Sequence, residues 1–284
     1  MKRSAPNSHR RRPTHRLVRI ALRGWDTERS WRAITELHMR GNPAVLELVR
    51  RLSRSSNWRR RALGMRIASQ LRQRRRDAEF GSVEYEKEAT QQLLLAGLRD
   101  AREAVVEAAV AGLSHRPHAA ALAELVRLAE HRSAGLRWAV AVALGRYDEP
   151  EAIQALLRLA RDTDDDVRDW ATFGLGTMHD VDTPEVRELL WCNLRDPDPD
   201  VRGEALVGLA ERGDRRAVAH LTGLLGEDCR VFELIAAEKF ADRGLLPALQ
   251  ALQPAIGDKH VDEDWLRHLQ EAIKASSDGA PVAS

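Results

Sequence analysis

Four similar nine-residue segments recur along the middle of the chain, and their regular spacing points to a repeat architecture. The first residue of each segment, here called the anchor, is apolar, and apolar residues or glycine follow four, seven and eight positions later. This spacing places them on one face of a helix. Consecutive anchors are 31, 31 and 34 residues apart, which predicts stacked repeats that bury their apolar faces against one another. The segments are 105–113, 136–144, 167–175 and 201–209, with more degenerate copies at 59–67 and 232–240.

Each repeat is predicted to be a hairpin of two helices. The segment 150–161 is typical of the first helix, because a proline near its start is preset for the first helical turn. Acidic turns at 162–166 and 196–200 precede the second helix, whose free N–H groups and dipole their aspartates complement. Small residues seven positions after the anchor are expected to permit close helix packing. The prolines are Pro117, Pro150 and Pro184, and the small residues are Gly112, Ala143, Gly174 and Gly208.

The second-helix pattern, D-x-x-V-R-x-x-A-x-x-x-L-G, resembles HEAT repeats of the phycobilisome-lyase-like type. The best matches are Asp164–Gly176 and Asp198–Ala210, and the resemblance covers roughly residues 30–274. It implies an α-solenoid that binds other proteins, because most such repeats serve as binding surfaces. It does not imply lyase activity, since nothing in the sequence identifies a bilin pocket.

The predicted fold class is all-α: an α-α superhelix, or solenoid, of HEAT-like helical hairpins. Runs of Val, Ile, Thr and Tyr that indicate strands are nearly absent. We expect a disordered basic tail at 1–13, basic N-terminal HEAT-like or capping helices at 14–71, an inserted loop at 72–86, a repeat array at 87–275 and a disordered tail at 276–284.

Charge is strongly segregated along the chain, although the net charge is only +2. Residues 1–76 contain 22 Lys and Arg against four acids, a net charge of +18, and residues 77–284 carry 23 bases and 39 acids, a net charge of −16. Such segregation bears on partners rather than on fold. Two copies could associate head to tail, or the basic end could bind an acidic protein or another polyanion.

Nucleic-acid binding is the main alternative to protein binding. Arginine forms two-pronged contacts with phosphate, aromatic rings stack on bases, and three tryptophans, Trp25, Trp31 and Trp58, are interleaved with the arginines. The tryptophans could equally fill a capping core, and Arg outnumbers Lys 40 to 5 throughout, which indicates a general compositional bias. The candidate anion-binding residues are Arg59, Arg60, Arg61, Arg74, Arg75 and Arg76.

A partner-binding surface is predicted on the second helices. Residues two and six positions after the anchor should point away from the core, toward the concave surface that solenoids use for ligands. Apolar side chains at such positions indicate a protein partner, although packing against the next repeat would also explain them. The candidate residues are Trp138, Val142, Asp169, Phe173 and Val207.

No catalytic residue, metal site or cofactor is predicted. HEAT-type hydroxylases hold iron with His-Glu pairs, and this chain contains no His-Glu dipeptide, so His115, His118 and His131 are expected to be turn residues. The acidic turn 162–166 lacks the glycine and glutamate of a calcium loop and is better interpreted as a capping turn. An enzyme of the lyase or hydroxylase class remains a weaker alternative to a non-enzymatic scaffold.

A cytoplasmic location is expected. The two cysteines, Cys192 and Cys229, lie in different repeats without close companions, which favours a reducing compartment. No stretch approaches the roughly 18 apolar residues that a membrane-spanning helix needs.

Overall fold

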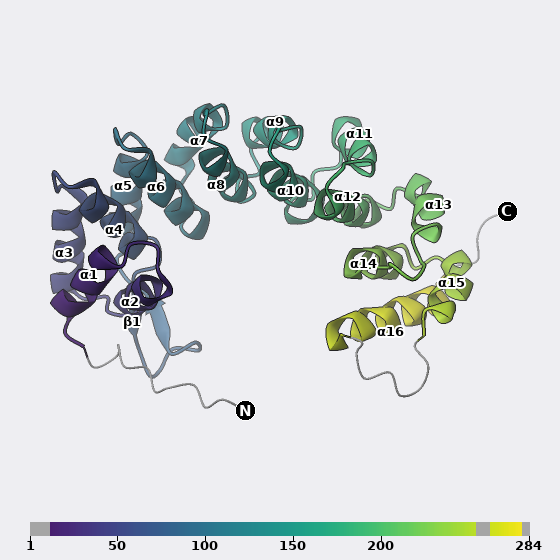
Figure 1. Cartoon of the computed structure of the whole chain (residues 1–284), viewed down its shortest axis with the longest axis horizontal. Helices are drawn as coiled ribbons and strands as arrows, with labels where there is room; N and C mark the ends of the chain where they lie inside the picture. The colour runs from purple at the N-terminus through teal and green to yellow at the C-terminus, as the bar shows by residue number, and fades with distance from the viewer. Residues whose placement is uncertain (1–11, 254–261, 280–284) are drawn as a thin grey trace. The chain divides into compact units, whose positions relative to one another are not determined.

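The computed structural model of the chain describes residues 12–253 and 262–279 and divides into two compact units, Met1–Tyr147 and Asp148–Ser284. The described residues form 16 α-helices, short 3₁₀ and π segments and one two-stranded sheet (Figure 1). The prediction of an all-α fold built from stacked helical hairpins is therefore confirmed. No described helix is long and apolar enough to cross a membrane.

The first unit contains four pairs of helices and the small sheet. Its second helices, α4, α6 and α8, pack against one another in series, while α1 and α2 cover α4 at the N-terminal end. The elements are α1 (Thr14–Arg23), α2 (Glu28–His38), α3 (Pro43–Ser53), α4 (Trp58–Ala68), β1 (Arg72–Arg74), β2 (Ser82–Glu84), α5 (Lys87–Gly97), α6 (Glu103–His115), the 3₁₀ turn η1 (Ala119–Ala121), α7 (Leu122–Leu128) and α8 (Ala134–Leu144).

The second unit continues the hairpin pattern. Figure 1 shows its first helices, α9, α11 and α13, in one row and its second helices, α10, α12 and α14, in another, with α16 packed on α14. The elements are α9 (Pro150–Leu159), α10 (Asp165–Phe173), the π-helix η2 (Gly174–Met178), α11 (Pro184–Asn193), α12 (Pro199–Glu211), α13 (Arg216–Thr222), α14 (Val231–Phe240), the 3₁₀ turn η3 (Arg243–Leu245), α15 (Leu246–Ala251) and α16 (Glu263–Asp278).

The anchor residues form the core of each unit, because all four are buried between consecutive hairpins: Val105, Leu136, Val167 and Val201. The surface that the second helices of a unit present on the side opposite its first helices is called its "second-helix face". The residues two and six positions after the anchors are those expected on this face.

Local signals at the helix ends act as predicted. The side chain of Asp164 accepts a hydrogen bond from the Val167 backbone N–H, and that of Asp198 accepts one from the Val201 N–H. Pro150 and Pro184 begin α9 and α11. Pro117 does not begin a helix, because the next helical residue is Ala119 in η1. Each capped helix therefore begins within its acidic turn, at Asp165 and at Pro199, rather than after it.

Close helix packing depends on glycine at the predicted position in the second unit. A Cβ atom built on Gly208 would lie 2.7 Å from the Cα atom of Gly176, so α12 and η2 approach each other backbone to backbone. In the first unit, a Cβ on Gly112 would lie 2.4 Å from a methyl carbon of Leu94, within one hairpin. Both contacts leave no room for a side chain.

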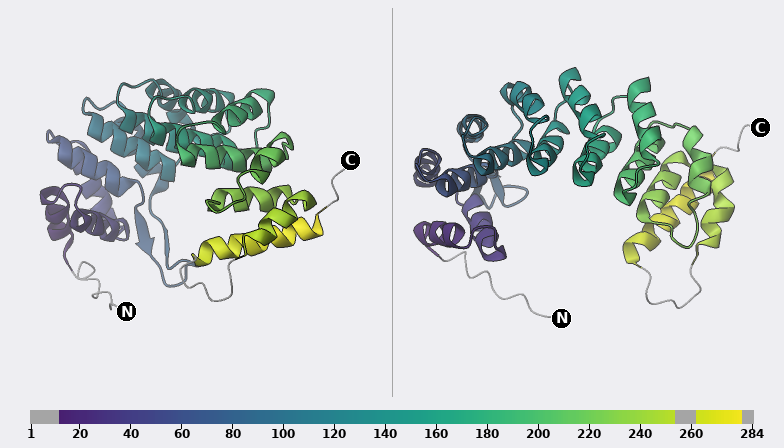
Figure 2. Two further views of the ribbon diagram at one scale, coloured as in Figure 1. Left: turned by 45° about the vertical axis from the view of Figure 1, so that its right-hand side comes forward. Right: turned by 45° about the horizontal axis from the view of Figure 1, so that its top comes forward.

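Residues 72–86 are not a plain loop as expected. They form an antiparallel hairpin of β1 and β2, in which Arg72 pairs with Glu84 and Arg74 with Ser82, and Gly81 turns with a φ of +65° (Figure 2). An isolated bridge joins Gln73 to Arg40, just after α2. Strands of three residues are too short for an alternating pattern to reveal them, which explains the wrong prediction.

The C-terminal boundary also differs from the prediction. Helix α16 continues to Asp278, and Ser276 within it is fully buried, so the tail cannot begin at residue 276. The expected tails otherwise fall mostly on residues 1–11 and 280–284, which lie outside the described residues.

Two arginines, the buried Arg116 and the half-buried Arg212, join consecutive repeats within their units. Only 1% of Arg116 is exposed, and its guanidinium donates to the backbone oxygens of Ser69 and Leu71 and to the hydroxyl of Thr90. Arg212 does the same at the end of α12 and donates to five carbonyl oxygens, those of Leu175, Gly176, His179, Val181 and Gly208. Each arginine thus satisfies carbonyls where the preceding second helix ends.

Candidate functional site

The first unit holds a pocket of about 340 Å³ on its second-helix face. Its floor is α6, which presents the small side chains of Ala104, Ala108 and Ala111. Trp31 of α2 and Trp138 of α8 also line it, and 44% of Trp31 is exposed although tryptophan is usually well covered. The alanines of the floor and the aromatic side chains around them leave a hollow large enough for a single large side chain.

An arginine between two tryptophans adjoins this pocket. The guanidinium carbon of Arg66 lies 4.2 Å from the ring centre of Trp25 and 4.4 Å from that of Trp31. Its Nη1 atom pairs with Asp26 at 2.8 Å. Trp25 also packs edge to face on Trp58, with ring centres 5.4 Å apart. Stacking and pairing together hold Arg66 in place and offset most of its charge.

Apart from Arg66, the polar side chains that line the pocket carry no positive charge. Loss of hydration in the hollow raises the pKa of Glu107, and the charges of Glu103 and Asp26 add to the effect while Arg66 opposes it. Burial lowers the pKa of His38 and of His115, which keeps both imidazoles neutral near pH 7. The pocket is therefore an aromatic hollow with a carboxyl group on its floor.

The second unit places two carboxyl groups on its second-helix face, Asp169 of α10 and Glu204 of α12. Burial raises the pKa of Asp169 to about 6, and Asp200, Asp198 and Asp166 contribute further. Burial raises the pKa of Glu204 to about 8, and the charge of Asp169 adds to the shift. One oxygen of Asp169 is buried without a hydrogen-bond partner. The raised pKa keeps Glu204 mostly protonated near pH 7, and neither carboxyl group pairs with a basic side chain of the described residues.

Aromatic rings also lie on the helices that carry these carboxyl groups or pack against them. Phe173 follows Asp169 by one helical turn and packs edge to face on Trp170, with ring centres 5.7 Å apart. Phe232 of α14 packs on Gly203, the residue before Glu204: a Cβ on Gly203 would lie 2.4 Å from the ring. This face thus combines aromatic and acidic side chains, as the pocket of the first unit does.

The predicted partner-binding residues divide between the units and differ in exposure. Trp138 and Val142 of the first unit and Asp169 and Phe173 of the second are partly exposed. Val207, by contrast, is only 5% exposed, so its assignment to a solvent-facing surface is wrong. Helix α14 packs on α12 and brings Phe232 onto Gly203, which removes the inner positions of this repeat from solvent.

The predicted anion-binding arginines do not form one free cluster. Arg61 makes two hydrogen bonds to Asp100, of 2.7 and 2.8 Å, Arg74 pairs with Glu36 at 2.9 Å, and Arg75 pairs with Asp77. Arg59 lies over the ring of Trp58 at 5.4 Å. Arg60 and Arg76 are exposed and have no acidic partner among the described residues. Half of the set therefore serves internal ion pairs.

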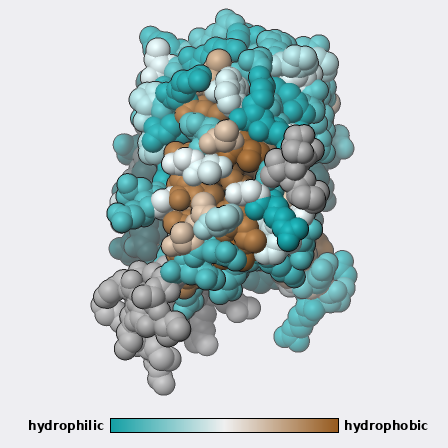
Figure 3. Space-filling model, turned by 90° about the vertical axis from the view of Figure 1, so that its right-hand side faces the viewer, coloured by the Kyte–Doolittle hydropathy of each residue, from teal (hydrophilic) through white to brown (hydrophobic). Residues whose placement is uncertain are grey.

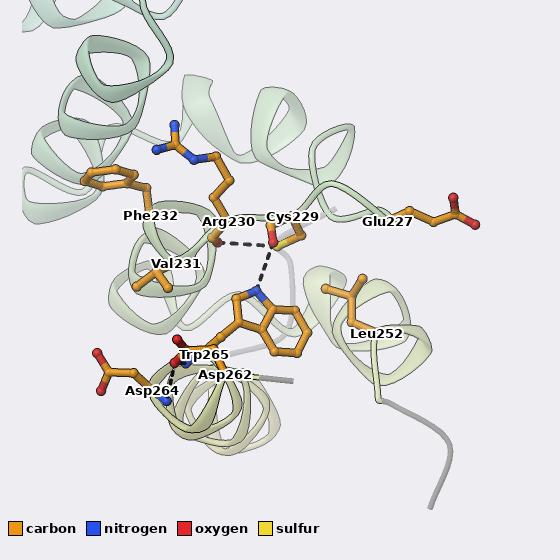
Figure 4. Close-up of a pocket in the computed structure, with 9 residues that line it drawn as sticks. All are labelled: Glu227, Cys229, Arg230, Val231, Phe232, Leu252, Asp262, Asp264 and Trp265. Atoms are coloured by element: carbon orange, nitrogen blue, oxygen red, sulfur yellow. Dashed lines mark hydrogen bonds between the residues drawn. The ribbon is translucent and has the colours of Figure 1, made fainter. Parts of the chain in front are cut away.

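The two cysteines differ in surroundings, and Figure 4 shows those of Cys229, beside a pocket of about 590 Å³ in the second unit. The indole N–H of Trp265 donates to the Cys229 backbone oxygen at 2.9 Å, which ties α16 to the start of α14. Burial raises the pKa of the Cys229 thiol to about 12, so this group is a poor nucleophile. Cys192 is exposed.

Two groups of side chains in the described residues have ligand atoms near enough to hold a metal ion. In the first, Glu238, His268 and Glu271, Arg267 already contacts both Glu271 and His268. The second, Asp164, Asp165 and Asp166, caps α10 as predicted. Exposed acidic groups are often found close together in this way without a bound ion.

Hydrophobic side chains also gather at the end of the second unit. Seen from the side on which α13 and α15 lie in Figure 1, they form a strip between polar margins (Figure 3). Leu224, just after α13, is exposed. Among the described residues, no further hairpin covers this end of the stack.

Comparisons with known proteins agree with the repeat architecture. Residues 91–176 match the family described as HEAT repeats, and the stacked helical hairpins define the class of the chain as an α-solenoid. The X-ray structure of Escherichia coli YibA shares 22% identity over 96% of this chain and 99% of that one, with a TM-score of 0.69. The phycobilisome-lyase-like subtype stays a prediction.

Two further solved structures have the same type of fold. A chain of the S. pombe condensin Cnd3–Cnd2 subcomplex shares 19% identity, with a TM-score of 0.56 over 93% of this chain and 38% of that one. An engineered protein shares 17% identity, with a TM-score of 0.53 over 93% of this chain and 79% of that one. No curated protein matches the sequence significantly. These similarities show the fold alone.

Proposed function

We propose that this chain is a non-enzymatic scaffold that binds another protein through its second-helix faces. The observation that carries the proposal is the pocket between Trp31 and Trp138, where a large, partly exposed aromatic side chain borders a hollow with a floor of alanines. Exposed tryptophans beside a hollow are typical of the hot spots of protein interfaces. The condensin chain with a similar fold is part of a complex with another subunit, which supports a binding role for such repeats.

The proposal is tested by using the full chain as bait for its partner in a native lysate. Trp31→Ala and Trp138→Ala should each reduce the amount of captured partner at least about tenfold, the size of effect typical of interface tryptophans. The matched control is Phe80→Ala, because Phe80 is an aromatic residue that is 80% exposed and lies in the β1–β2 connection, outside the pocket. Equal capture by all variants would contradict the proposal.

Nucleic-acid binding is a second candidate, and one observation favours it. Arg59 stacks on Trp58, and neighbouring Arg60 is exposed without an acidic partner among the described residues, as is Arg76. These three arginines could contact phosphates, but the ion pairs of Arg61, Arg74 and Arg75 reduce the available charge. In this case Arg59→Gln with Arg60→Gln should weaken binding of a single-stranded DNA and decrease its salt dependence. Purified protein free of nucleic acid and inert toward DNA would exclude this candidate.

A further inference from the structure

The N-terminal part of the first unit carries an excess of basic charge that its own acidic residues do not balance. Residues 12–71 contain 14 arginines and only four acidic residues, whereas residues 72–147 contain 12 basic and 10 acidic residues. The second unit, residues 148–284, contains 15 basic and 29 acidic residues. A general preference for arginine over lysine does not explain this excess, because elsewhere in the chain acidic residues accompany the arginines.

Each of the four acidic residues in this part already has an arginine partner. The pairs are Asp26 with Arg66, Glu28 with Arg32, Glu36 with Arg40 and Arg74, and Glu47 with Arg50. Other arginines of this part are exposed and form no ion pair with the described residues. Among them are Arg16, Arg19 and Arg23 of α1 and Arg59 and Arg60 of α4. The charge of these five side chains is available to an external partner.

Three of these arginines form a row along α1. Arg16, Arg19 and Arg23 are three and four residues apart, which places them on one side of the helix. Leu17 and Ala21, both buried, lie on the other side, where α1 packs against α2 and α4. No acidic residue occurs in α1. The row therefore presents basic side chains alone, over about 10 Å of helix axis.

The start of α4 lies beside the end of this row. Trp25, two residues after α1, packs edge to face on Trp58, the first residue of α4, with ring centres 5.4 Å apart. This contact brings the end of α1 to the helical turn that carries Arg59 and Arg60. The five exposed arginines of the two helices are together called the basic face: Arg16, Arg19, Arg23, Arg59 and Arg60.

The basic face has no apolar anchor of the kind that protein partners and membranes need. The large hydrophobic residues that are exposed in the described part of the chain are Trp31, Phe80 and Leu224, and none lies on α1 or α4. Protein interfaces are usually centred on such anchors and depleted of charge. A helix that lies on a membrane inserts its apolar side, but in α1 this side is buried within the unit. An extended polyanion therefore fits this face best.

The state of the neighbouring aromatic rings favours a duplex over a single strand. Trp25 and Trp58 pack on each other, and the guanidinium groups of Arg66 and Arg59 lie over them. Proteins that bind single strands use free aromatic rings to stack bases, and these two rings are already in use. Contacts to phosphate need only arginine side chains. A duplex strand carries one phosphate per about 3.4 Å of its axis, so the row on α1 spans several phosphates.

We propose that the basic face binds the phosphate backbone of a nucleic-acid duplex without reading its sequence. Arg16, Arg19 and Arg23 make the main contacts, and Arg59 and Arg60 add to them. This activity goes beyond the proposed scaffold function and does not require the second-helix faces. It differs from the single-strand binding considered above in the form of the nucleic acid and in its dependence on α1.

The test measures binding of a fluorescent DNA duplex of about 20 base pairs to the full chain by anisotropy at several salt concentrations. Arg16→Gln, Arg19→Gln and Arg23→Gln in one variant should raise Kd at least about tenfold at about 50 mM salt. The slope of log Kd against log salt should fall by about 2–3, since each lost phosphate contact removes about 0.9. A second duplex of shuffled sequence should bind within about twofold of the first, because contacts to phosphate do not read bases.

A matched control removes the same charge elsewhere. Arg132, Arg158 and Arg243 are also exposed and form no ion pair with described residues. Their combined replacement by glutamine should change Kd less than about twofold and leave the salt slope unchanged, because these side chains lie outside the basic face. Circular dichroism checks that both triple variants are folded. An equal loss of affinity in the two variants would overturn the inference, because net charge alone would then explain binding.

Three other probes separate the duplex from competing partners. The inference is wrong if a single strand of the same length, a polyglutamate peptide of similar charge or an anionic phospholipid vesicle binds more tightly than the duplex. It is also wrong if the α1 triple variant captures less protein partner from lysate, because the row would then belong to a protein interface. If the duplex does not bind while capture still depends on Trp31, the scaffold function stands and this inference alone fails.

Discussion

Arg168 of α10 donates two hydrogen bonds of 2.8 Å to the carboxylate of Asp196, which lies in the turn of the following hairpin. The side chains are only 13% and 9% exposed. Arg61 donates a similar pair of hydrogen bonds to Asp100 between consecutive hairpins of the first unit. Although burial acts to raise it, these bonds hold the pKa of Asp196 below its ordinary value. Arg–Asp pairs therefore join consecutive hairpins at these two junctions.

Breaking the Arg168–Asp196 pair should destabilise the second unit. Arg168→Ala or Asp196→Ala is expected to lower the free energy of unfolding by about 2–4 kcal/mol, because each leaves the other charge buried without its partner. A double-mutant cycle in urea should give a coupling energy above about 1 kcal/mol. A coupling near zero would show that the pair acts like an exposed surface bridge.

Replacing Arg116 by lysine should be costly despite the conserved charge. An ammonium group cannot reach the carbonyls of Ser69 and Leu71 and the Thr90 hydroxyl at once, so buried acceptors lose their donors. We expect a loss of about 2–4 kcal/mol in thermal or chemical unfolding. Lysine at exposed Arg60 is the control and should change stability by less than about 0.5 kcal/mol. Equal stability of the two variants would contradict the fastening role.

Gly208→Ala should destabilise the second unit by about 1–3 kcal/mol, because the added methyl group meets the Gly176 backbone and α12 must move away from η2. Gly226→Ala is the matched control, since a Cβ there meets nothing within 4 Å. Comparable melting temperatures for both variants would show that the close backbone contact between Gly208 and Gly176 is not needed.

The raised pKa values predict stability that falls as pH rises. Burial raises the pKa of Glu204 to about 8 and that of Asp169 to about 6, both above their unfolded values. At a pH between the unfolded and the folded pKa of each group, the folded chain therefore binds more protons than the unfolded chain. Their contribution to stability is fully present below about pH 4 and is lost as pH rises through 6 and 8. Asp200 also faces Glu204 and adds to its shift.

Glu204→Gln should therefore stabilise the chain at pH 8.5 by about 1–2 kcal/mol and have little effect at pH 5, since each unit of pKa shift corresponds to about 1.4 kcal/mol. Urea unfolding at the two pH values measures this difference. Wild-type stability that does not fall between pH 5 and 8.5, or destabilisation by Gln at pH 8.5, would show that Glu204 is ionised and paired in the folded chain.

The repeat architecture could be predicted because it depends on local periodicity. The anchors and Asp164 and Asp198 signal helix faces and helix starts within a few residues of sequence, and the structure confirms each of them. The β1–β2 hairpin and the burial of Val207 could not be predicted in this way. The first depends on pairing of three-residue strands, and the second on how α14 of the next hairpin packs on α12.

The candidate site was predictable only in part. Trp138 and Asp169 follow from their positions after the anchors, but Trp31 and Arg66 come from helices outside the regular repeats and meet Trp138 only in the fold. Glu107 is two residues after its anchor, at a position expected on the second-helix face. A single acidic residue at such a position does not by itself indicate a pocket. Glu204 is three residues after its anchor, outside the positions expected on the second-helix face, so the sequence pattern does not select it. Arg61 and Arg74 pair with Asp100 and Glu36, which lie far from them in the sequence, so the sequence alone left both arginines as candidates for anion binding.

Hydrogen–deuterium exchange of the full chain, with and without its captured partner, tests the central claim most directly. Protein binding through the second-helix faces predicts slower exchange in α6 and α8 of the first unit and in α10 and α12 of the second, with the first helices α5, α7, α9 and α11 unchanged. Protection of the first helices with unchanged exchange in the second helices would contradict the proposed function.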